Sequence, residues 1–472
     1  MAPQELILSA CSSETTAIAP GRSTSAPAIH LHDLLSASSV QPFKTSVSSA
    51  QSVSHVQTRA DAGGAIYAVQ EGKAIVHVWA WQKDQMHLKL HLPEKLSCFK
   101  VSPDGCWAAG GSPTGHIYLW EISSGLLHAS FTAHYRTVTT LTFSADSRVL
   151  VTSSMDSSVH VYLVSRLVDP EGDVQKPYGT LNDHTLGIRD VSVSKTSSAL
   201  GGRCLTASDD GTVKLWSLSA PFDLLSTFTF PPGVVPCVLA LEPSERYFYV
   251  GTTGGDVYHV PLFKRRGELG GANSDIEAIG GGGQGAPPTK VEGAVISYKS
   301  PITALALSLS SSHLLVGTQS ADIHIHSLPS HQHLRTISSH AGPITHLSCL
   351  LRPPDLVGST TTKHDAWPAP EIKPLERMRM GRTARDVQEV TMTLRPTPAS
   401  TLDALRGPRS NQLASSSSSV ALPGDDQLAE LLAENKRLRS SLDRATKIND
   451  KMWNGIVDSH LLPKQDQPNG HV

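Results

Sequence analysis

Short runs of β-branched and apolar residues recur along most of the chain, and polar or glycine-rich turns separate them. The segments "VTTLTFSAD", "VLVTSSMD" and "VHVYLV" are typical: each is short, alternates in polarity and is bounded by Ser, Asp or Gly. This pattern predicts β-strands joined by tight turns rather than amphipathic helices. We therefore expect an all-β fold over this part of the chain.

One strand core of four residues repeats along the chain. It reads VHVW, IYLW, VHVY, VKLW, VYHV and IHIH, and it ends at Trp79, Trp120, Tyr162, Trp216, Val260 and His326. The intervals are 41, 42, 54, 44 and 66 residues, and the two long ones contain the insertions "DPEGDVQKPYG" and "KRRGELGGANSDIEAIGGGGQGAPPTKVEG". A strand–turn–strand unit of this length cannot cover its own apolar faces. Stacking such units around an axis covers both faces, which predicts a closed ring.

The segment "TASDDGTVKLW" at residues 206–216 resembles the signature of WD40 repeats, whose period is about 40–45 residues. "FKVSPDG" at residues 99–105 and the histidines His134, His184 and His340 before three blades extend the resemblance. The resemblance implies a buried hydrogen-bonded chain, here called a brace, of a histidine, a Ser/Thr, a turn aspartate and a tryptophan. The fullest set is His184, Thr206 (or Ser208), Asp210 and Trp216, and the second is His134, Thr152 and Asp156 with Tyr162 in place of tryptophan.

A seventh repeat can be assembled from the two ends of the domain. "ELILSACSSE" and "PAIHLHDLL" supply its middle strands, "QPFKTSV" an outer strand and "ITHLSCLL" at residues 344–351 the inner strand. Such closure removes open sheet edges. We expect a single seven-bladed WD40 β-propeller over residues 1–352, with a disordered insertion at about 264–295 that contains the linker-like "GGGGQG".

The sequence changes character after the propeller. Residues 353–424 are rich in Pro, Ser and Thr and predict a mostly irregular linker, with a hairpin near "VQEVTMTL" that packs on the propeller as one option. The heptad pattern of residues 425–457 predicts a coiled-coil helix. Its a and d positions are Leu428, Leu431, Asn435, Leu438, Leu442, Ala445, Asn449 and Met452. Asparagine at position a favours pairing with a second copy or a partner helix, and a single amphipathic helix docked on another surface is the alternative.

Composition narrows the class of protein. The chain has 472 residues, 17% charged and 5% aromatic, and a net charge of -2, which excludes a globally basic nucleic-acid binder. The six cysteines form no CxxC pair, which favours reduced thiols in the cytosol or nucleus. The N-terminus lacks a basic region before its short apolar run, so we expect no signal peptide. No stretch approaches the length of a membrane-spanning helix, so we expect no membrane partner.

The candidate catalytic and metal-binding residues are better explained by structural roles. Asp209 and Asp210 are adjacent carboxylates, but a general acid–base pair would need both in one cleft, whereas Gly211 indicates a turn. His324 and His326 share a strand face, yet two ligands do not make a zinc site. No nucleotide-binding or hydrolase motif is placed between a strand and a helix. We expect a non-enzymatic protein without cofactor or metal.

Two small basic clusters have three possible roles: a nuclear-import signal, contact with phosphates, or a solvated surface. They are Lys264, Arg265 and Arg266, and Arg377, Arg379, Arg382 and Arg385. Acidic residues interspersed around the second cluster favour the solvated surface there. Direct contact with RNA is left open.

The arrangement of one propeller followed by a helix that ends "KINDKMWNGIV" resembles the propeller subunit of the pre-rRNA-processing complex that matures the large ribosomal subunit. The resemblance implies a nuclear scaffold, in nucleolus and nucleoplasm, that joins a helical-repeat subunit and a third subunit on precursor particles. It further implies removal of the second internal transcribed spacer, precursor export, recruitment of a midasin-type AAA ATPase and a link to replication licensing. An adaptor in a ubiquitin ligase or in trafficking is the alternative, because the fold alone names no function.

Overall fold

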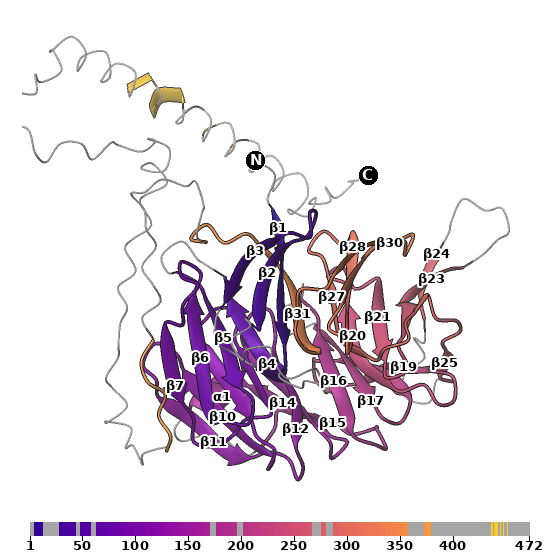
Figure 1. Ribbon diagram of the computed structural model, residues 1–472, viewed down its shortest axis with the longest axis horizontal. Helices are drawn as coiled ribbons and strands as arrows, with labels where there is room; N and C mark the ends of the chain where they lie inside the picture. The colour runs from indigo at the N-terminus through magenta and orange to yellow at the C-terminus, as the bar shows by residue number, and fades with distance from the viewer. Residues whose placement is uncertain are drawn as a thin grey trace, which may run out of the picture. The chain divides into compact units, whose positions relative to one another are not determined.

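Seven sheets of four or five strands, the blades of a propeller, follow one another around the molecule (Figure 1). The computed structural model describes residues 4–12, 28–43, 48–57, 63–169, 176–195, 202–266, 275–279, 287–356 and 372–378, and also Lys436, Arg437, Arg439, Ser440, Ser441, Arg444, Lys447 and Lys451. Within these residues most strands of each blade are consecutive in the chain and pair antiparallel. The predicted seven-bladed all-β propeller is confirmed.

The first three blades follow the chain in order. Blade 1 consists of β4 (Ser48–Val56), β5 (Ala65–Gln70), β6 (Ile75–Ala80) and β7 (Leu88–His91). Blade 2 consists of β8 (Cys98–Val101), β9 (Trp107–Gly111), β10 (His116–Glu121) and β11 (Leu127–Thr132). Blade 3 consists of β12 (Val138–Phe143), β13 (Val149–Ser154), β14 (Val159–Leu163) and β15 (Gly179–Leu181), and the short helix α1 (Val164–Val168) follows β14.

Blades 4, 5 and 6 follow, and the longer insertion lies between two strands of blade 5. Blade 4 consists of β16 (Ile188–Val193), β17 (Arg203–Ser208), β18 (Thr212–Ser217) and β19 (Leu224–Thr229), with β25 (Thr289–Lys290) added in parallel. Blade 5 consists of β20 (Pro236–Leu241), β21 (Tyr247–Thr252), β22 (Asp256–Pro261) and β26 (Ile296–Ser297). Blade 6 consists of β27 (Ile302–Leu307), β28 (His313–Thr318), β29 (Ile323–Ser327) and β30 (His333–Ile337).

The last blade joins the two ends of the propeller sequence. Its strand order is β3 (Ser39–Phe43), β2 (Ile29–Asp33), β1 (Glu5–Cys11) and β31 (Ile344–Leu351). β1 pairs with β31 over its whole length, and Figure 1 places the two strands side by side. The inner strands β4, β8, β12, β16, β20, β27 and β31 each contact the next, and β31 contacts β4. The ring is therefore closed by the N-terminal segment, as the sequence predicted.

Apolar side chains fill the seven interfaces between neighbouring blades. Each interface contains one cluster of buried residues contributed by both blades. Phe228 of blade 4 and Phe248 of blade 5, for example, pack edge to face with ring centroids 5.2 Å apart. A fully buried side chain of this size contributes about 2 kcal/mol to folding. The strand alternation thus places apolar residues on both faces of each blade, where only a neighbouring blade can cover them.

The insertion expected to be disordered is partly folded, which corrects that prediction. β23 (Phe263–Arg266) pairs with β24 (Asp275–Ala278), and β25 extends blade 4. Val291 is buried in the cluster between blades 4 and 5, and Ile279 packs against that cluster. The carbonyl of Ile279 also accepts a hydrogen bond from Ser226 at 2.8 Å. Apolar residues at the ends of the insertion anchor it, and "GGGGQG" lies outside the described residues.

The propeller unit continues beyond residue 352. Leu356 is buried between blades 7 and 1. Residues 372–376, here called the strap, have no regular secondary structure, but Ile372 and Leu375 are buried in the cluster between blades 1 and 2. Part of the expected linker therefore packs on the propeller, because its two apolar side chains complete a blade interface. The expected hairpin near "VQEVTMTL" lies outside the described residues.

The C-terminal residues form a separate unit, residues 396–472. The residues described in it, between Lys436 and Lys451, are helical and exposed. All expected a and d residues of the coiled coil lie outside the described residues. Pairing through this segment stays a prediction.

Candidate interaction site

The fullest brace expected from the sequence forms in blade 4. His184 Nδ1 lies 2.9 Å from Asp210 Oδ2, and His184 Nε2 lies 2.7 Å from Thr206 Oγ1. The indole N–H of Trp216 donates to the same Thr206 oxygen at 3.0 Å. Ser208 instead donates to a loop carbonyl at 3.0 Å. The structure brings the four residues into one chain and selects Thr206 over Ser208.

One arrangement of hydrogens satisfies every member of this brace. Thr206 Oγ1 accepts the Trp216 N–H, so its own hydrogen points to His184 Nε2. The hydrogen of His184 is then on Nδ1 and donates to the Asp210 carboxylate. The side chain of His184 has no exposed surface. A histidine between a hydroxyl and a carboxylate therefore ties β17, β18 and the preceding loop together.

The Asp210 carboxyl is held in its ionised form. Burial by itself would raise its pKa, but hydrogen bonds from His184 and Thr212 outweigh burial and hold the pKa well below its usual range. The backbone N–H of Thr185 and the N–H of Thr212 also donate to it, at 3.2 and 2.9 Å. Asp210 is therefore an acceptor fixed in a turn, not a group ready to exchange protons near neutral pH.

The second brace, in blade 3, is complete except for its aromatic member. His134 Nδ1 lies 3.1 Å from Asp156 Oδ2, and its Nε2 lies 2.9 Å from Thr152 Oγ1. The hydroxyl of Tyr162 lies 3.3 Å from His160 Nδ1 instead of bonding to Thr152. The expectation that Tyr162 takes the place of tryptophan is wrong, because a phenol hydroxyl projects from the end of its ring whereas an indole N–H projects from the side.

Asp209 and Asp210 engage separate partners. Asp209 Oδ1 accepts a hydrogen bond from Arg189 Nε at 2.6 Å at the exposed start of β16. Asp210 points to His184, as described above. The two carboxyls therefore do not face each other as a general acid–base pair would. This arrangement supports the structural reading of the "DDG" turn.

The partners of three tryptophans at the same strand position differ from blade to blade. Trp216 has Thr206 as acceptor, but the register of the first two blades places Gly110 and Ala68 where blade 4 has this threonine. In blade 2 the indole N–H of Trp120 turns to the strap. In blade 1 the indole nitrogen of Trp79 is buried and has no hydrogen-bond partner. The small residues remove the acceptor and leave the rest of the blade intact.

The strap acts as a substitute brace for blade 2. Trp120 Nε1 donates to the Glu376 carbonyl at 2.9 Å, and the Glu376 N–H donates to the Gly125 carbonyl at 2.8 Å. The Glu376 carboxylate accepts the N–H of Leu127 at 3.1 Å. A Cβ on Gly125, whose φ is +75°, would lie 2.2 Å from the Pro374 carbonyl. Sequence reasoning missed this role, and the only signal for it is an isolated "IKPLE" in a polar stretch.

A second polar group lies on the inner strands, where the sequence suggested nothing. Gln51 of β4 donates to Asp190 Oδ1 of β16 at 3.4 Å across the ring. The other Asp190 oxygen accepts the Leu239 N–H at 2.8 Å. Lys100 of β8 donates to the Val53 carbonyl at 3.2 Å. Gln51 has a φ of +56° within an irregular part of β4, which turns its side chain toward the axis.

Burial and mutual charge change the acidities of these inner residues. Burial raises the pKa of Asp190 to about 6, although backbone N–H groups and Lys100 oppose this. Burial lowers the pKa of Lys100, and Asp190 opposes that change. Burial together with Lys100 lowers the pKa of His55 to about 4 and that of His346 well below its usual value. This cluster connects blades 1, 2, 4 and 7 by charge and hydrogen bonds, with Asp190 buried and the other four residues partly exposed.

Two large apolar side chains project from loops that the braces hold. Tyr135 follows His134 and is 97% exposed, and Leu186 lies two residues after His184 and is 52% exposed. The N–H of Tyr135 donates to Asp156 at 3.1 Å, which anchors this loop to the blade 3 brace. Exposed aromatic residues on rigid supports are typical of protein interfaces. These two residues are the candidate partner contacts that the sequence analysis did not single out.

The remaining sequence candidates do not assemble into a site. His324 Nδ1 lies 3.0 Å from Thr336 Oγ1, and His326 Nδ1 lies 3.1 Å from the His331 carbonyl. In the part of the chain that the structure describes, no three His, Cys, Asp or Glu residues are grouped as metal ligands would be. Arg377 is exposed, and the side chains of the other expected basic residues lie outside the description. None of the described helices has the length and apolarity needed to cross a membrane.

Comparison with known proteins agrees with the repeat pattern. The family model described as "WD domain, G-beta repeat" matches residues 82–121, 125–162 and 175–217. These matches cover strands of blades 2, 3 and 4, and the two braces lie in blades 3 and 4.

Several full-length relatives are similar to most of the chain. Pre-rRNA-processing protein IPI3 of Mycosarcoma maydis is 30% identical over 85% of this chain and 87% of its own length. The protein of the same name in Yarrowia lipolytica is 31% identical over 73% of this chain and 78% of its own. Protein ROOT INITIATION DEFECTIVE 3 of Arabidopsis thaliana is 27% identical over 78% of this chain and 80% of its own length. The closed propeller, its braces and these alignments together show that the chain belongs to the WD40-repeat family of pre-rRNA-processing protein IPI3.

Proposed function

We propose that this protein is a non-catalytic scaffold for pre-rRNA processing. The observation that carries the proposal is the similarity to fungal proteins named for pre-rRNA processing, which extends over most of both chains. The structure supports it in a second way. The conspicuous His, Asp, Thr and Trp side chains are used as internal braces, so they are not available for chemistry, whereas Tyr135 and Leu186 are presented to partners.

The finer role follows from the family resemblance. The protein acts in removal of the second internal transcribed spacer and in maturation and export of large-subunit precursors, with a further link to replication licensing. Its partners are a helical-repeat subunit, a third subunit and a midasin-type AAA ATPase on precursor particles. Its location is the nucleus, in both nucleolus and nucleoplasm. No membrane contact is part of this role, and direct RNA contact is left open.

The C-terminal segment contributes pairing in this proposal. Positions a and d of the expected helix, from Leu428 to Met452, form the seam, and Asn435 and Asn449 set its register. Light scattering of the full chain and of a chain ending before Asp425 tests this. The shortened chain should have the smaller assembly mass, and an unchanged mass would remove the pairing from the proposal.

Depletion of the protein in the cells that produce it tests the central role. Precursor RNAs that still contain the second internal transcribed spacer should accumulate, and the tagged protein should sediment with large-subunit precursors. Re-expression of the wild-type chain is the control. Normal spacer processing after complete depletion would contradict the proposal.

Affinity purification with mass spectrometry separates this role from the alternative adaptor functions. Ribosome-assembly factors should be recovered with the tagged protein. Recovery of cullin or coat proteins without ribosome factors would instead favour a ubiquitin-ligase or trafficking adaptor. A Tyr135→Ala variant should reduce recovery of the partners without changing the fold, because its side chain is almost fully exposed.

A further inference from the structure

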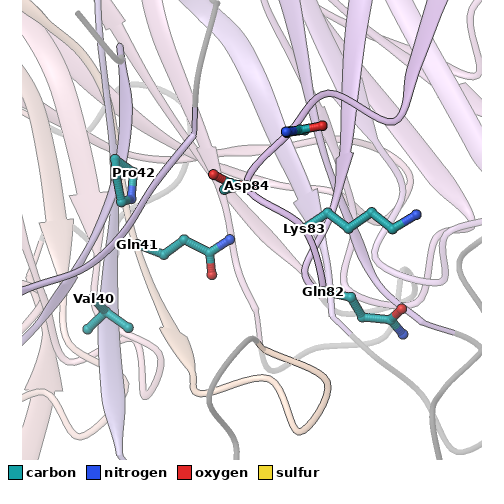
Figure 2. Close-up of a pocket in the computed structure, with 7 residues that line it drawn as sticks. Val40, Gln41, Pro42, Gln82, Lys83 and Asp84 are labelled. Carbon is teal, nitrogen blue, oxygen red and sulfur yellow. The ribbon is translucent and has the colours of Figure 1, made fainter.

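A pocket lies between the outer strand of blade 7 and a loop of blade 1. Val40, Gln41 and Pro42 of β3 line one side, and residues 82–85 of the β6–β7 loop line the other. Its volume is about 420 Å³. Figure 2 shows Gln41 extending from β3 toward the side formed by Gln82 and Lys83. The pocket is separate from the braces and from the strap.

Gln41 is the unusual residue of this pocket. Its side chain is on the same strand face as Phe43, which packs against Trp79 and Trp81 with ring centroids 6.4 Å apart. Gln41 is only 6% exposed, yet neither Nε2 nor Oε1 has a hydrogen-bond partner. A buried amide without a hydrogen-bond partner loses its water and gains nothing in return. A leucine would fit the same face without this cost.

An unpaired side-chain amide offers one acceptor and one donor group side by side. The group that complements both at once is another amide, and the commonest amide in a protein is the peptide group. The charged side chains of the pocket also favour an uncharged ligand. Lys83 and Asp84 are adjacent and opposite in sign, so the wall does not favour an anion or a cation.

The position of β3 adds a geometric reason. β3 is at the edge of its sheet and pairs with β2 on one side only. Pro42 lacks an N–H, so a further strand cannot pair along this edge without interruption. A segment that lies in the pocket would therefore depend on the Gln41 side chain for its main-chain hydrogen bonds. Rotation about the soft terminal torsion of Gln41 turns the amide toward it.

We propose that this pocket binds an extended, uncharged peptide segment of a partner protein, and that Gln41 recognises its main chain through paired N–H···O and C=O···H–N hydrogen bonds. The occupant is a protein segment and not a phosphate, a metal ion or a nucleic acid. The proposal is independent of the role in pre-rRNA processing. It depends only on the pocket, whichever complex contains this chain.

Selection of short random peptides displayed on phage against the full-length protein tests the proposal. Enriched peptides are synthesised and titrated by calorimetry into the wild-type chain, the Gln41→Leu variant and the Gln319→Leu variant. Gln319 is exposed in the β28–β29 turn of another blade and serves as the matched control. The Gln41→Leu variant should bind about tenfold more weakly, because two hydrogen bonds are lost, and the control should bind like the wild type.

Thermal unfolding supplies the second readout. The Gln41→Leu variant should unfold at the same or a higher temperature than the wild type, since it removes a buried amide that has no partner in the fold. If that variant does not fold, the Gln41→Glu variant, which keeps the size of the side chain and removes the N–H donors, takes its place and should also lose peptide binding.

Three results would overturn the proposal. The first is that no peptide is enriched on the wild-type chain relative to the Gln41→Leu variant. The second is that enriched peptides bind both chains equally. The third is an assembly mass that rises with protein concentration and depends on Gln41, which would make a second copy of this chain the occupant.

Discussion

Blade 4 and blade 6 hold the same turn, between their second and third strands, by different means. In blade 4 the turn aspartate Asp210 accepts hydrogen bonds from a histidine of the preceding loop and from several N–H groups. In blade 6 the register places Ser320 where blade 4 has Asp210. The nearby Asp322 accepts only a hydroxyl, Ser320 Oγ at 3.2 Å, among the contacts described, and the Ser320 N–H is held by Ser300 at 3.1 Å. One turn is braced by a buried charge and the other by small hydroxyls.

The difference extends to the strand positions of the brace. The register places Val316 in blade 6 where blade 4 has Thr206, so the acceptor at the centre of the brace is missing. His326 stands at the position of Trp216 and bonds to the Tyr298 hydroxyl instead. The comparison teaches that the brace forms as a unit. When its threonine is replaced, the aromatic residue of the third strand finds a partner elsewhere, as Trp120 does in the strap, or has none, as Trp79 does.

The largest expected effect is a loss of stability that differs between substitutions of Asp210 and of Asp322. Asp210→Ala should lower the free energy of unfolding by about 3 kcal/mol, because it removes the acceptor of the buried His184 Nδ1–H and of backbone N–H groups in the turn. Asp322→Ala should cost less than about 1 kcal/mol. Urea denaturation followed by tryptophan fluorescence measures both. Equal losses would contradict the distinction between the two blades.

Acid should weaken the braced blades first. The folded-state pKa values of Asp210 and Asp156 are lowered by their hydrogen bonds, so their contribution is complete above the unfolded value of about 4 and is lost as the pH falls below it. The wild type should lose about 1 kcal/mol per brace between pH 7 and pH 3. Asp210→Asn, which cannot titrate, should show a smaller loss between pH 7 and pH 3. An unchanged pH dependence would mean that these carboxyls do not control acid unfolding.

The strap can be tested separately from the blade braces. Gly125→Ala should cost about 2 kcal/mol, because its Cβ would collide with the Pro374 carbonyl and because φ is positive there. Gly233→Ala is the matched control: its φ is +86°, but nothing lies within 4 Å of the added Cβ, so it reports backbone strain alone. Hydrogen exchange of the Glu376 amide should become faster only in the Gly125 variant. The same exchange rate in both variants would contradict docking of the strap through Gly125.

The smallest expected effect is the difference in stability between substitutions of two tryptophans. Trp216→Phe and Trp79→Phe remove the same ring atoms, but only Trp216 gives up a hydrogen bond, to Thr206. The Trp216 variant should therefore be less stable than the Trp79 variant by about 1 kcal/mol. Thermal unfolding of the two variants measures the difference. A larger loss for Trp79→Phe would show that the missing bond is not what distinguishes these sites.

The repeat and the brace partners were predictable because they depend on local pattern. The spacing of the cores that end at Trp79, Trp120 and Trp216 placed the third strand of each blade, and "TASDDGTVKLW" placed the aspartate beside a turn glycine. The strap, the folded ends of the insertion and the inner polar cluster were not predictable in this way. Each depends on residues such as Glu376 and Gln51 that meet their partners only after distant segments are brought together.

The sequence by itself determined the alternation of strands and turns and the number of blades, because period and turn chemistry act over a few residues. The family resemblance added the brace of blade 4, and the structure chose Thr206 over Ser208. Only the tertiary structure decided that Tyr162 turns away from Thr152, that Trp120 takes its acceptor from the strap and that the Gln41 amide is buried without a partner. Hydrogen-bond direction and the register between neighbouring strands settle these contacts, and neither is encoded in the spacing of residues along the chain.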